Sequence, residues 1–291
     1  MSTAPWPEPP PLPPGRTILV PGRGELFVRD TGGDGPPVVL LHGWTASGEL
    51  NWFLQWQTLA DAGRRVVLVD HRGHGRGIRA RRRFSLEDCA DDVAGLCGEL
   101  RLVRPVLVGY SMGGPIAVLT AHRHAGLVGG LVLAATAMEW RATIAERLGW
   151  RVQLPAMSVA LRTGAARRAL RRLLDRAATA APELEPYVEW ASGEAARGTV
   201  REVLDAGRAL SRYDARRIVA GLDVPAEVVI TTKDRLVAPE KQRAQARAFG
   251  AEPIEVAADH DATLVAGAEL ATAIEVAVDR LLDGREERAA S

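Results

Sequence analysis

Cysteine is scarce in this sequence, which holds only Cys89 and Cys97 among its 291 residues. The two stand eight positions apart in one predicted helix, so roughly 12 Å of helix axis separates them. That distance is too long for a disulfide bond. Neither cysteine belongs to a Cys-x-x-Cys pair or a Cys/His cluster, so the sequence indicates no disulfide framework and no zinc site. We expect both to be buried as small hydrophobic residues.

The sequence also has no long apolar run. Residues 127–138 come closest, but they include two glycines and fall short of the ~20 residues of a membrane span. Residues 4–14 are rich in proline and follow no basic start or apolar segment, so they do not resemble a secretory signal. We therefore expect no integral membrane span and a cytoplasmic location, with residues 1–16 as a flexible or polyproline arm.

No sign of charge predominates. The formal net charge is +1, which provides no global attraction to nucleic acid or to membranes, and we expect no nucleic-acid partner. Lysine is almost absent, since Lys233 and Lys241 are the only two, and the arginines are interspersed with acids as on a solvated surface. Length and composition fit one large globular domain, or one domain with an insertion.

Apolar strands alternate with helices along most of the chain. Residues 17–20 and 25–29 flank a Pro-Gly-Arg-Gly turn and predict a hairpin. Further strands are predicted at 38–41, 65–69, 106–108, 131–134, 226–231 and 253–256, and helices at 52–62, 85–100, after 113, at 238–249 and at 262–283. The continuous apolar character of these strands is typical of burial on both faces. The alternation therefore predicts an α/β fold with a mostly parallel, doubly wound sheet.

Strand signals stop between residues 138 and 219. Three or four helical segments are predicted there, with breaks near Pro155, Gly164, residues 182–186 and Gly198. This pattern indicates a helical insertion. It divides the α/β core into residues 17–137 and 220–284, and leaves residues 285–291 as a charged tail.

A serine stands in a glycine-rich turn between a predicted strand and a predicted helix. The segment Gly109-Tyr110-Ser111-Met112-Gly113 matches the G-x-S-x-G nucleophile elbow. Gly109 and Gly113 have no Cβ, so strand and helix can approach closely. The turn holds Ser111 above a helix N-terminus, whose free N–H groups favour developing negative charge.

The rest of the chain supplies the partners that such a serine needs. Asp234 and His260 follow Ser111, in the Ser-Asp-His order expected with this elbow. Each comes after a predicted parallel strand, so all three should lie along one edge of the sheet. The backbone N–H of Met112, and that of Trp44 in the loop after residues 38–41, are the candidate oxyanion-hole donors.

Several other carboxylates compete with Asp234 for the role of the acid. Asp259 and Asp261 neighbour His260 in sequence, but adjacent residues should point away from its ring. Glu139 follows the strand at 131–134 and would serve if that strand carried the acid. We favour Asp234.

Five motifs carry a resemblance to a known family. They are, in chain order, His42-Gly43-Trp44, Asp70-His71-Arg72-Gly73-His74-Gly75, Gly109-Tyr110-Ser111-Met112-Gly113-Gly114, Asp234-Arg235-Leu236-Val237 and Asp259-His260. In type, order and separation they resemble the motifs of the α/β-hydrolase superfamily, over about residues 17–283 apart from the insertion. Within it, the core resembles esterases, C–C hydrolases and cofactor-free haloperoxidases.

The resemblance implies that residues 138–219 form a helical cap over the site. A serine at the elbow, where dehalogenases and epoxide hydrolases have aspartate, speaks against those branches. It also implies that His42 and His74 are structural residues that hydrogen-bond the loops shaping the site.

Two features of the predicted cap allow more than one interpretation. Arg167, Arg168, Arg171 and Arg172 repeat at helical spacing beside leucines, as in an anion site, a membrane-facing surface or an ordinary solvated helix, which we favour. A set of large side chains could line an apolar acyl pocket or form the core of the cap: Trp140, Trp150, Trp190, Met138 and Met157.

These observations predict a serine hydrolase that acts on carboxylic esters of small to medium hydrophobic substrates, without a metal or organic cofactor. Ser111 is the expected nucleophile, His260 the base and Asp234 the acid, through an acyl-enzyme. Two alternatives use the same residues: a C–C bond hydrolase and a cofactor-free haloperoxidase or perhydrolase. A non-catalytic ligand-binding protein of this fold is a third. The sequence leaves open the natural substrate, its chain length and the oligomeric state, a homodimer included.

Overall fold

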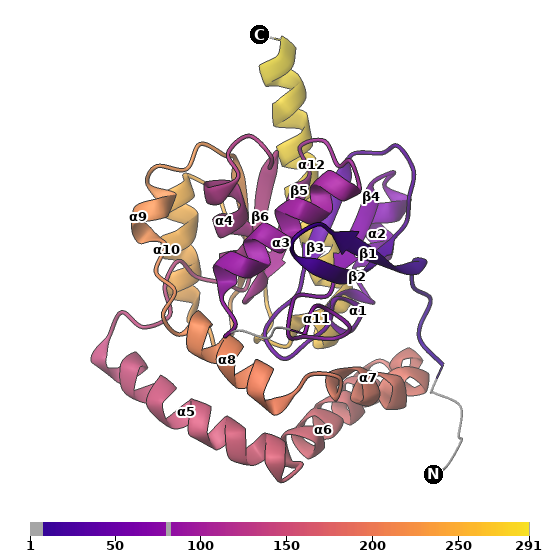
Figure 1. The fold of residues 1–291 in the computed structure, drawn as a ribbon, viewed down its shortest axis with the longest axis vertical. Helices are drawn as coiled ribbons and strands as arrows, with labels where there is room; N and C mark the ends of the chain where they lie inside the picture. Colours follow the sequence, from indigo (N-terminus) through magenta and orange to yellow (C-terminus); the bar gives the residue numbers. More distant parts are fainter. Residues whose placement is uncertain (1–7, 80–82, 291) are drawn as a thin grey trace.

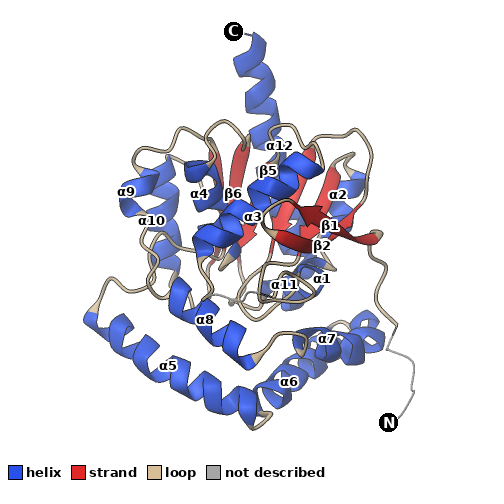
Figure 2. Cartoon of the chain, in the orientation of Figure 1, coloured by secondary structure: helices blue, strands red, loops and turns tan. Residues whose placement is uncertain are grey.

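A twisted eight-stranded sheet lies at the centre of the computed structural model, which describes residues 8–79 and 83–290 (Figures 1 and 2). The strands are β1 (Gly15–Val20), β2 (Gly24–Asp30), β3 (Pro37–Leu41), β4 (Arg65–Val69), β5 (Val106–Tyr110), β6 (Gly130–Ala134), β7 (Ala226–Thr231) and β8 (Ile254–Val256). Their order is β1-β2-β4-β3-β5-β6-β7-β8. Only the β1–β2 and β2–β4 pairs are antiparallel, and all later pairs are parallel. The predicted mostly parallel, doubly wound sheet is confirmed.

Helices cover both faces of this sheet. They are α1 (Gly48–Trp52), α2 (Trp56–Asp61), α3 (Leu86–Glu99), α4 (Gly113–Arg123), α10 (Pro239–Phe249), α11 (Ala262–Val265) and α12 (Gly267–Ala290). One apolar core joins the sheet to α3 and α4, and includes Leu96 and Ile116. A second core, on the other face, joins it to α1, α2 and α12, and includes Trp52 and Ile274. The strands are therefore buried on both sides, as their continuous apolar character requires.

A group of helices is inserted in the sequence between β6 and β7, and most of them lie at one end of the molecule (Figure 1). It comprises α5 (Ile144–Arg162), α6 (Ala165–Ala180), the 3₁₀ helix η1 (Pro182–Tyr187), α7 (Val188–Ala195), α8 (Val200–Leu210) and α9 (Arg216–Val219). We call α5–α8 the cap helices. The helical insertion expected from the loss of strand signals is thus present.

The break expected at Pro155 is wrong. α5 continues through this residue. A proline inside a helix leaves the carbonyl four residues earlier without its N–H partner, here the carbonyl of Arg151. Both residues are exposed, so water can solvate that carbonyl and the helix continues.

The helix expected at residues 52–62 is two helices. The first begins earlier, at Gly48, because the Ser47 hydroxyl accepts the Leu50 N–H and Asp70 accepts the Gly48 N–H at 2.7 Å. Asp70 is distant in sequence, so local patterning could not reveal this start.

Both ends of the chain also differ from expectation. The terminal helix is interrupted at Ala266, and α12 then continues to Ala290, so the residues expected to form a charged tail are helical up to that point. β1 begins at Gly15, inside the expected N-terminal arm. In the described part of that arm, the Pro13 carbonyl accepts a hydrogen bond from Arg29 at 2.6 Å. Residues 1–7 of the predicted arm lie outside the described residues.

Cys89 and Cys97 are buried and unpaired, as predicted. Burial raises the pKa of the Cys97 thiol to about 12, which keeps it protonated and unreactive. Within the described part of the chain, no helix is both long enough and apolar enough to cross a bilayer.

Candidate active site

Ser111 lies at the tip of a strained turn between β5 and α4. Its φ of 52° is in the left-handed region that residues with a Cβ seldom adopt. Two hydrogen bonds hold it there: the Ser111 N–H donates to the Ala134 carbonyl at 3.0 Å, and Thr136 Oγ1 donates to the Ser111 carbonyl at 2.7 Å. A Cβ on Gly113 would lie 2.1 Å from the Leu41 carbonyl oxygen, so this position needs glycine. Packing against β3 and β6 therefore maintains the strain.

The structure brings the three candidate triad residues together. His260 Nε2 lies 2.9 Å from Ser111 Oγ, and His260 Nδ1 lies 2.8 Å from Asp234 Oδ2. Asp234 and Ser111 are buried, whereas His260 is partly exposed. The hydroxyl, the imidazole and the carboxylate thus form one continuous hydrogen-bonded chain.

The Asp234 carboxylate is surrounded by donors. Oδ1 accepts the backbone N–H groups of Leu236 and Val237 at 2.9 and 2.8 Å. Besides the His260 ring, Oδ2 accepts the Thr231 hydroxyl at 2.7 Å and the Gln242 amide at 3.2 Å. Burial by itself raises the pKa of this carboxyl, but the hydrogen bonds and the charge of His260 outweigh it and lower the pKa below its usual value. Asp234 is therefore ionised and can orient an imidazole.

Tyr110 and Asp259, for which the sequence indicated no such role, hold His260 in position. Tyr110 Oη donates to the His260 carbonyl at 2.8 Å, and Asp259 Oδ1 accepts both the His260 N–H and the Arg235 N–H. Tyr110 directly precedes the candidate nucleophile, which is the only sequence signal that could have indicated it. Thr231 and Gln242 carry no such signal, because their role depends on how β7 and α10 pack.

Two of the three competing carboxylates are occupied elsewhere. Asp259 accepts backbone N–H groups and pairs with Arg235, so it does not approach the His260 ring. Glu139 forms an ion pair with Lys241 at 2.8 Å. Asp261 lines the cavity described below.

The two candidate oxyanion donors have free N–H groups. Within the described residues, neither the Trp44 nor the Met112 backbone N–H has a hydrogen-bond acceptor. The Trp44 loop lies close to the nucleophile: a Cβ on Gly43 would be 3.3 Å from Ser111 Cβ. Asn51 Oδ1 accepts the Gly43 N–H at 3.0 Å, and the Trp44 indole donates to the Val203 carbonyl of α8 at 2.7 Å. The loop is therefore fixed to both the core and the cap helices.

His42, His71 and His74 form a buried cluster beside this loop. The centre of the His42 ring lies 4.4 Å from the centre of the His71 ring and 5.3 Å from that of the His74 ring. His42 Nε2 accepts the His71 N–H at 3.0 Å. Burial lowers the pKa of His71 to about 3 and that of His74 to about 4, so both rings are neutral. The contacts of His42 connect the loops after β3 and β4, which agrees with the structural role expected for it.

A cavity of about 960 Å³ extends from Ser111 and His260 to the cap helices. On the cap side, alanine, leucine and methionine predominate among its lining residues, which include Ala156, Met157 and Leu170. Among the five large side chains considered for an acyl pocket, only Met157 lines it. Trp190 instead packs against Phe53 in a separate apolar cluster, and the Trp150 indole donates to the Trp140 carbonyl.

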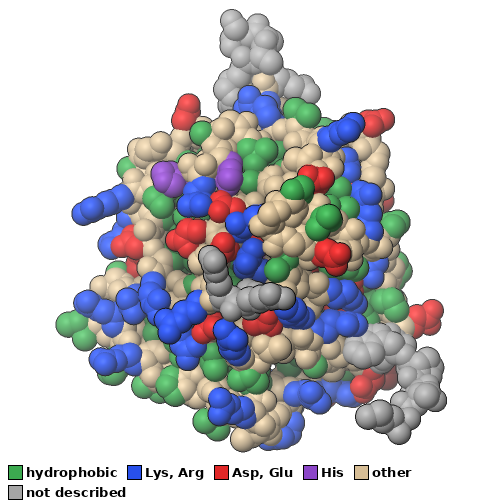
Figure 3. Space-filling view, viewed as in Figure 1, with side chains coloured by type: hydrophobic (Ala, Val, Ile, Leu, Met, Phe, Trp, Pro, Cys, Tyr) green, Lys and Arg blue, Asp and Glu red, His purple; other side chains and the backbone are tan. Residues whose placement is uncertain are grey.

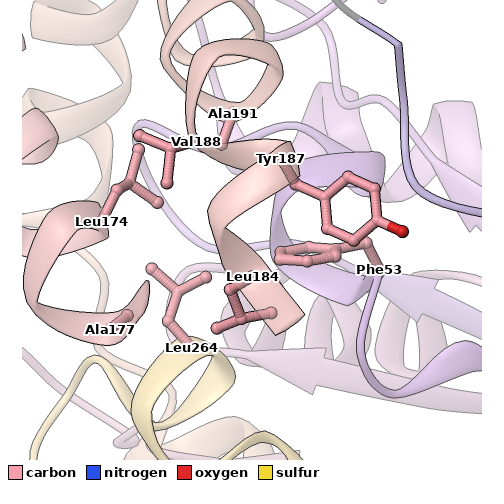
Figure 4. A pocket seen from close by; sticks show the side chains of 8 residues that line it. All are labelled: Phe53, Leu174, Ala177, Leu184, Tyr187, Val188, Ala191 and Leu264. Carbon is pink, nitrogen blue, oxygen red and sulfur yellow. The ribbon is translucent and has the colours of Figure 1, made fainter. Parts of the chain in front are cut away.

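A second, much smaller void of about 10 Å³ lies within that separate cluster (Figure 4). Its side chains are apolar except for the Tyr187 hydroxyl, which points away from the centre of the group (Figure 4). A space of this size is at the lower limit for one water molecule, and a water needs polar partners. It is a packing defect between α6, η1, α7, α11 and the residue that follows α1, and not a ligand site.

No group of three histidine, cysteine, aspartate or glutamate side chains in the described ranges is arranged to hold a metal ion. The arginines of α6 differ in their surroundings. Arg167 is exposed and lines the cavity, whereas Arg171 pairs with Asp175 at 2.8 Å and also with Glu189.

Comparison with known families gives one match that covers most of the chain. Residues 36–262 match the model of the family described as alpha/beta hydrolase fold. Among curated proteins, an AB hydrolase superfamily protein of Bacillus subtilis is 38% identical over 101 residues, which cover 35% of this chain and 37% of that protein. The chain thus matches little more than a third of the length of that relative.

Solved structures match over a much greater length. A bromoperoxidase from Bacillus anthracis aligns with a TM-score of 0.76 and 20% identity, over 91% of this chain and 100% of the other. A thermophilic esterase from Thermogutta terrifontis aligns with a TM-score of 0.75 and 24% identity, over 92% and 99%. At these identities the similarity shows the shared fold alone.

Proposed function

Because the chain belongs to the alpha/beta hydrolase fold family, we propose that it is a serine hydrolase that cleaves carboxylic esters of small to medium hydrophobic substrates. One observation carries the proposal. Ser111, His260 and Asp234 form a continuous hydrogen-bonded chain that opens into the large cavity.

In this proposal, His260 Nε2 accepts the Ser111 hydroxyl proton while Oγ attacks the ester carbonyl. The ionised Asp234 accepts a hydrogen bond from the Nδ1–H group of His260, which keeps the ring in the required tautomer and stabilises the imidazolium without transfer of that proton. The free N–H groups of Trp44 and Met112 donate to the oxyanion. His260 then returns its proton to the departing alcohol, and a water molecule repeats the sequence to release the acid.

The lining of the cavity supports an apolar acyl or alcohol group. Small and apolar side chains on α5 and α6 face Ser111 across the cavity, among them Ala156, Ala160 and Leu173. Such a surface favours a hydrocarbon group because apolar area is removed from water on binding.

C–C bond hydrolysis is a second candidate, because one buried amide is available near the nucleophile. Asn51 lines the cavity, and its Nδ2 has no partner within the described residues. A diketone substrate that also carries a carboxylate would need a donor of this kind. Asn51 already holds the Gly43 N–H through Oδ1, however, and this contact gives it a role in shaping the oxyanion loop. We therefore rank ester hydrolysis first.

A fluorophosphonate probe and a panel of activated esters of increasing acyl length test the proposal. We expect the probe to label the wild type and not Ser111→Ala, and the same variant to lose ester turnover. Ser192→Ala is the matched control, because Ser192 lines the same cavity but lies outside the hydrogen-bonded chain. It should retain labelling.

Two outcomes would contradict the proposal. If the wild type bound ligands but neither reacted with the probe nor hydrolysed any ester, a binding protein of this fold would be the better interpretation. If acyl transfer to hydrogen peroxide exceeded transfer to water, perhydrolysis would replace hydrolysis as the principal reaction.

A further inference from the structure

The outer face of α5 carries an unusual set of exposed apolar side chains. Ile144, Leu148, Val152 and Val159 are 78%, 60%, 63% and 61% exposed. The described residues include nine large hydrophobic side chains with such exposure, and the other five are spread over separate elements. Four on one helix form a patch rather than the single exposed residues that are normal on protein surfaces.

Helical spacing places these four side chains on one side of α5. At 3.6 residues per turn they fall within an arc of roughly 80°. The residues of α5 that line the cavity, such as Gln153, Met157 and Ala160, lie on the opposite side. No residue of α5 is buried. The helix thus separates the cavity from the outside of the molecule. One side of it faces the cavity, and the other side is exposed to solvent.

Basic charge is concentrated around this apolar stripe. Residues 141–176 contain nine arginines, one glutamate and one aspartate, a net charge of +7, although the whole chain carries only +1. All nine arginines are exposed. Figure 3 shows blue side chains next to green ones along the lower part of the molecule, where α5 and α6 lie. The remainder of the chain is therefore net acidic, and the molecule is electrically polarised toward its cap.

We propose that the surface formed by the apolar stripe of α5 and the arginines of residues 141–176 other than Arg167, which lines the cavity, docks on an anionic lipid surface. We call this surface the cap face. The apolar side chains would enter the boundary between headgroups and acyl chains, while the arginines contact lipid phosphates. Each basic residue near such a surface is attracted to the anionic lipids and so strengthens binding, and salt screens this attraction.

Charge excludes a second copy of the chain as the occupant of the cap face. A twofold dimer through this face would bring together two copies of residues 141–176, each with a net charge of +7, and like charges at an interface are unfavourable. A nucleic acid would neutralise the arginines but offers no apolar phase for Ile144 or Leu148. An anionic bilayer meets both requirements.

Docking in this way has a consequence for the cavity. Because α5 has the cap face on one side and the cavity on the other, only about one helix diameter, roughly 10 Å, separates the two. The cavity would then lie directly above the lipid surface.

Co-sedimentation of the full chain with vesicles tests the docking. We expect binding to mixed phosphatidylglycerol–phosphatidylcholine vesicles, much weaker binding to pure phosphatidylcholine, and release by salt. The double variant Leu148→Asp, Val152→Asp should reduce binding more than about ten-fold, because two apolar side chains can no longer insert. Arg147→Gln with Arg151→Gln should reduce it by about five-fold per arginine.

The matched control replaces two exposed apolar residues away from the cap, Leu19→Asp with Val103→Asp (65% and 78% exposed), and should bind like the wild type. Circular dichroism checks that each variant is folded. Three results would overturn the proposal: no co-sedimentation of the wild type, equal loss in the control, or a concentration-dependent dimer that the Leu148 and Val152 substitutions dissociate. None of these measurements uses the reactivity of Ser111, so the docking and the proposed hydrolysis fail separately.

Discussion

Replacement of Asp234 by asparagine tests the proposed role of the buried carboxylate. Asparagine keeps the size of the side chain but has only one oxygen. The backbone N–H groups of Leu236 and Val237 both point at Oδ1 and cannot turn away. The asparagine oxygen should therefore stay toward them, which places its NH₂ group against His260 Nδ1.

That exchange reverses the hydrogen bond to His260. Facing a donor, Nδ1 must become an acceptor, so the ring proton moves to Nε2, the atom 2.9 Å from Ser111 Oγ. An Nε2 that carries a proton cannot accept another one from the serine. We expect kcat to fall roughly 10,000-fold, the size of loss that a wrong tautomer causes, which corresponds to about 5.5 kcal/mol of transition-state stabilisation.

Initial rates on an activated ester measure this loss, with thermal unfolding as the check on folding. Asp259→Asn is the matched control, because its oxygen can still accept the His260 and Arg235 N–H groups. It loses mainly an ion pair to the exposed Arg235, which is worth little, so kcat should change less than about three-fold. If Asp234→Asn retained more than about a tenth of wild-type kcat, or if both variants lost equally, the assignment of Asp234 would be wrong.

Two further predictions concern stability. Burial lowers the pKa of His71 to about 3 and of His74 to about 4, so both stay neutral in the folded protein while the unfolded chain takes up protons below about pH 6.5. Acidification from about pH 7.5 to 5 should therefore lower the free energy of unfolding in urea by about 2–4 kcal/mol. Burial raises the pKa of Asp70 to about 6, so protonation of this carboxyl on acidification raises the free energy of unfolding, and the range above includes this opposing effect. An unchanged free energy of unfolding would contradict the buried neutral cluster. Gly113→Ala would place a Cβ 2.1 Å from the Leu41 carbonyl oxygen and should cost more than about 3 kcal/mol or prevent folding. Gly98→Ala, in α3 with nothing within 4 Å of the new Cβ, should be stabilising by about 0.5–1 kcal/mol; equal stability of the two variants would show that the elbow tolerates a side chain.

Local sequence patterns were sufficient to predict most of the sheet. The apolar runs predicted as strands correspond to β3 to β7 in the structure, because a strand buried on both faces must be apolar throughout. Helix boundaries were harder to predict from the sequence. The start of α1 depends on Asp70, and the continuity of α5 through Pro155 depends on exposure to water.

The candidate site could also be predicted in part from the sequence. Chain order placed Ser111, Asp234 and His260 at one edge of a parallel sheet, and in the structure His260 lies within hydrogen-bond distance of both Ser111 and Asp234. The supporting contacts of Tyr110 and Gln242 were not predictable. They join residues far apart in the chain through side chains that are common in any protein.

The sequence by itself determined the sharp turn at Ser111 and its order relative to Asp234 and His260, because the steric needs of such a turn and the direction of parallel strands are local properties. Tertiary structure alone decided what surrounds that turn. The pattern of α5 is compatible with a helix in any setting, and its surroundings depend on which neighbours bury each side. Only folding revealed that Met157 faces the cavity and Leu148 faces the outside, since burial is a property of packing between distant segments and not of the segment itself.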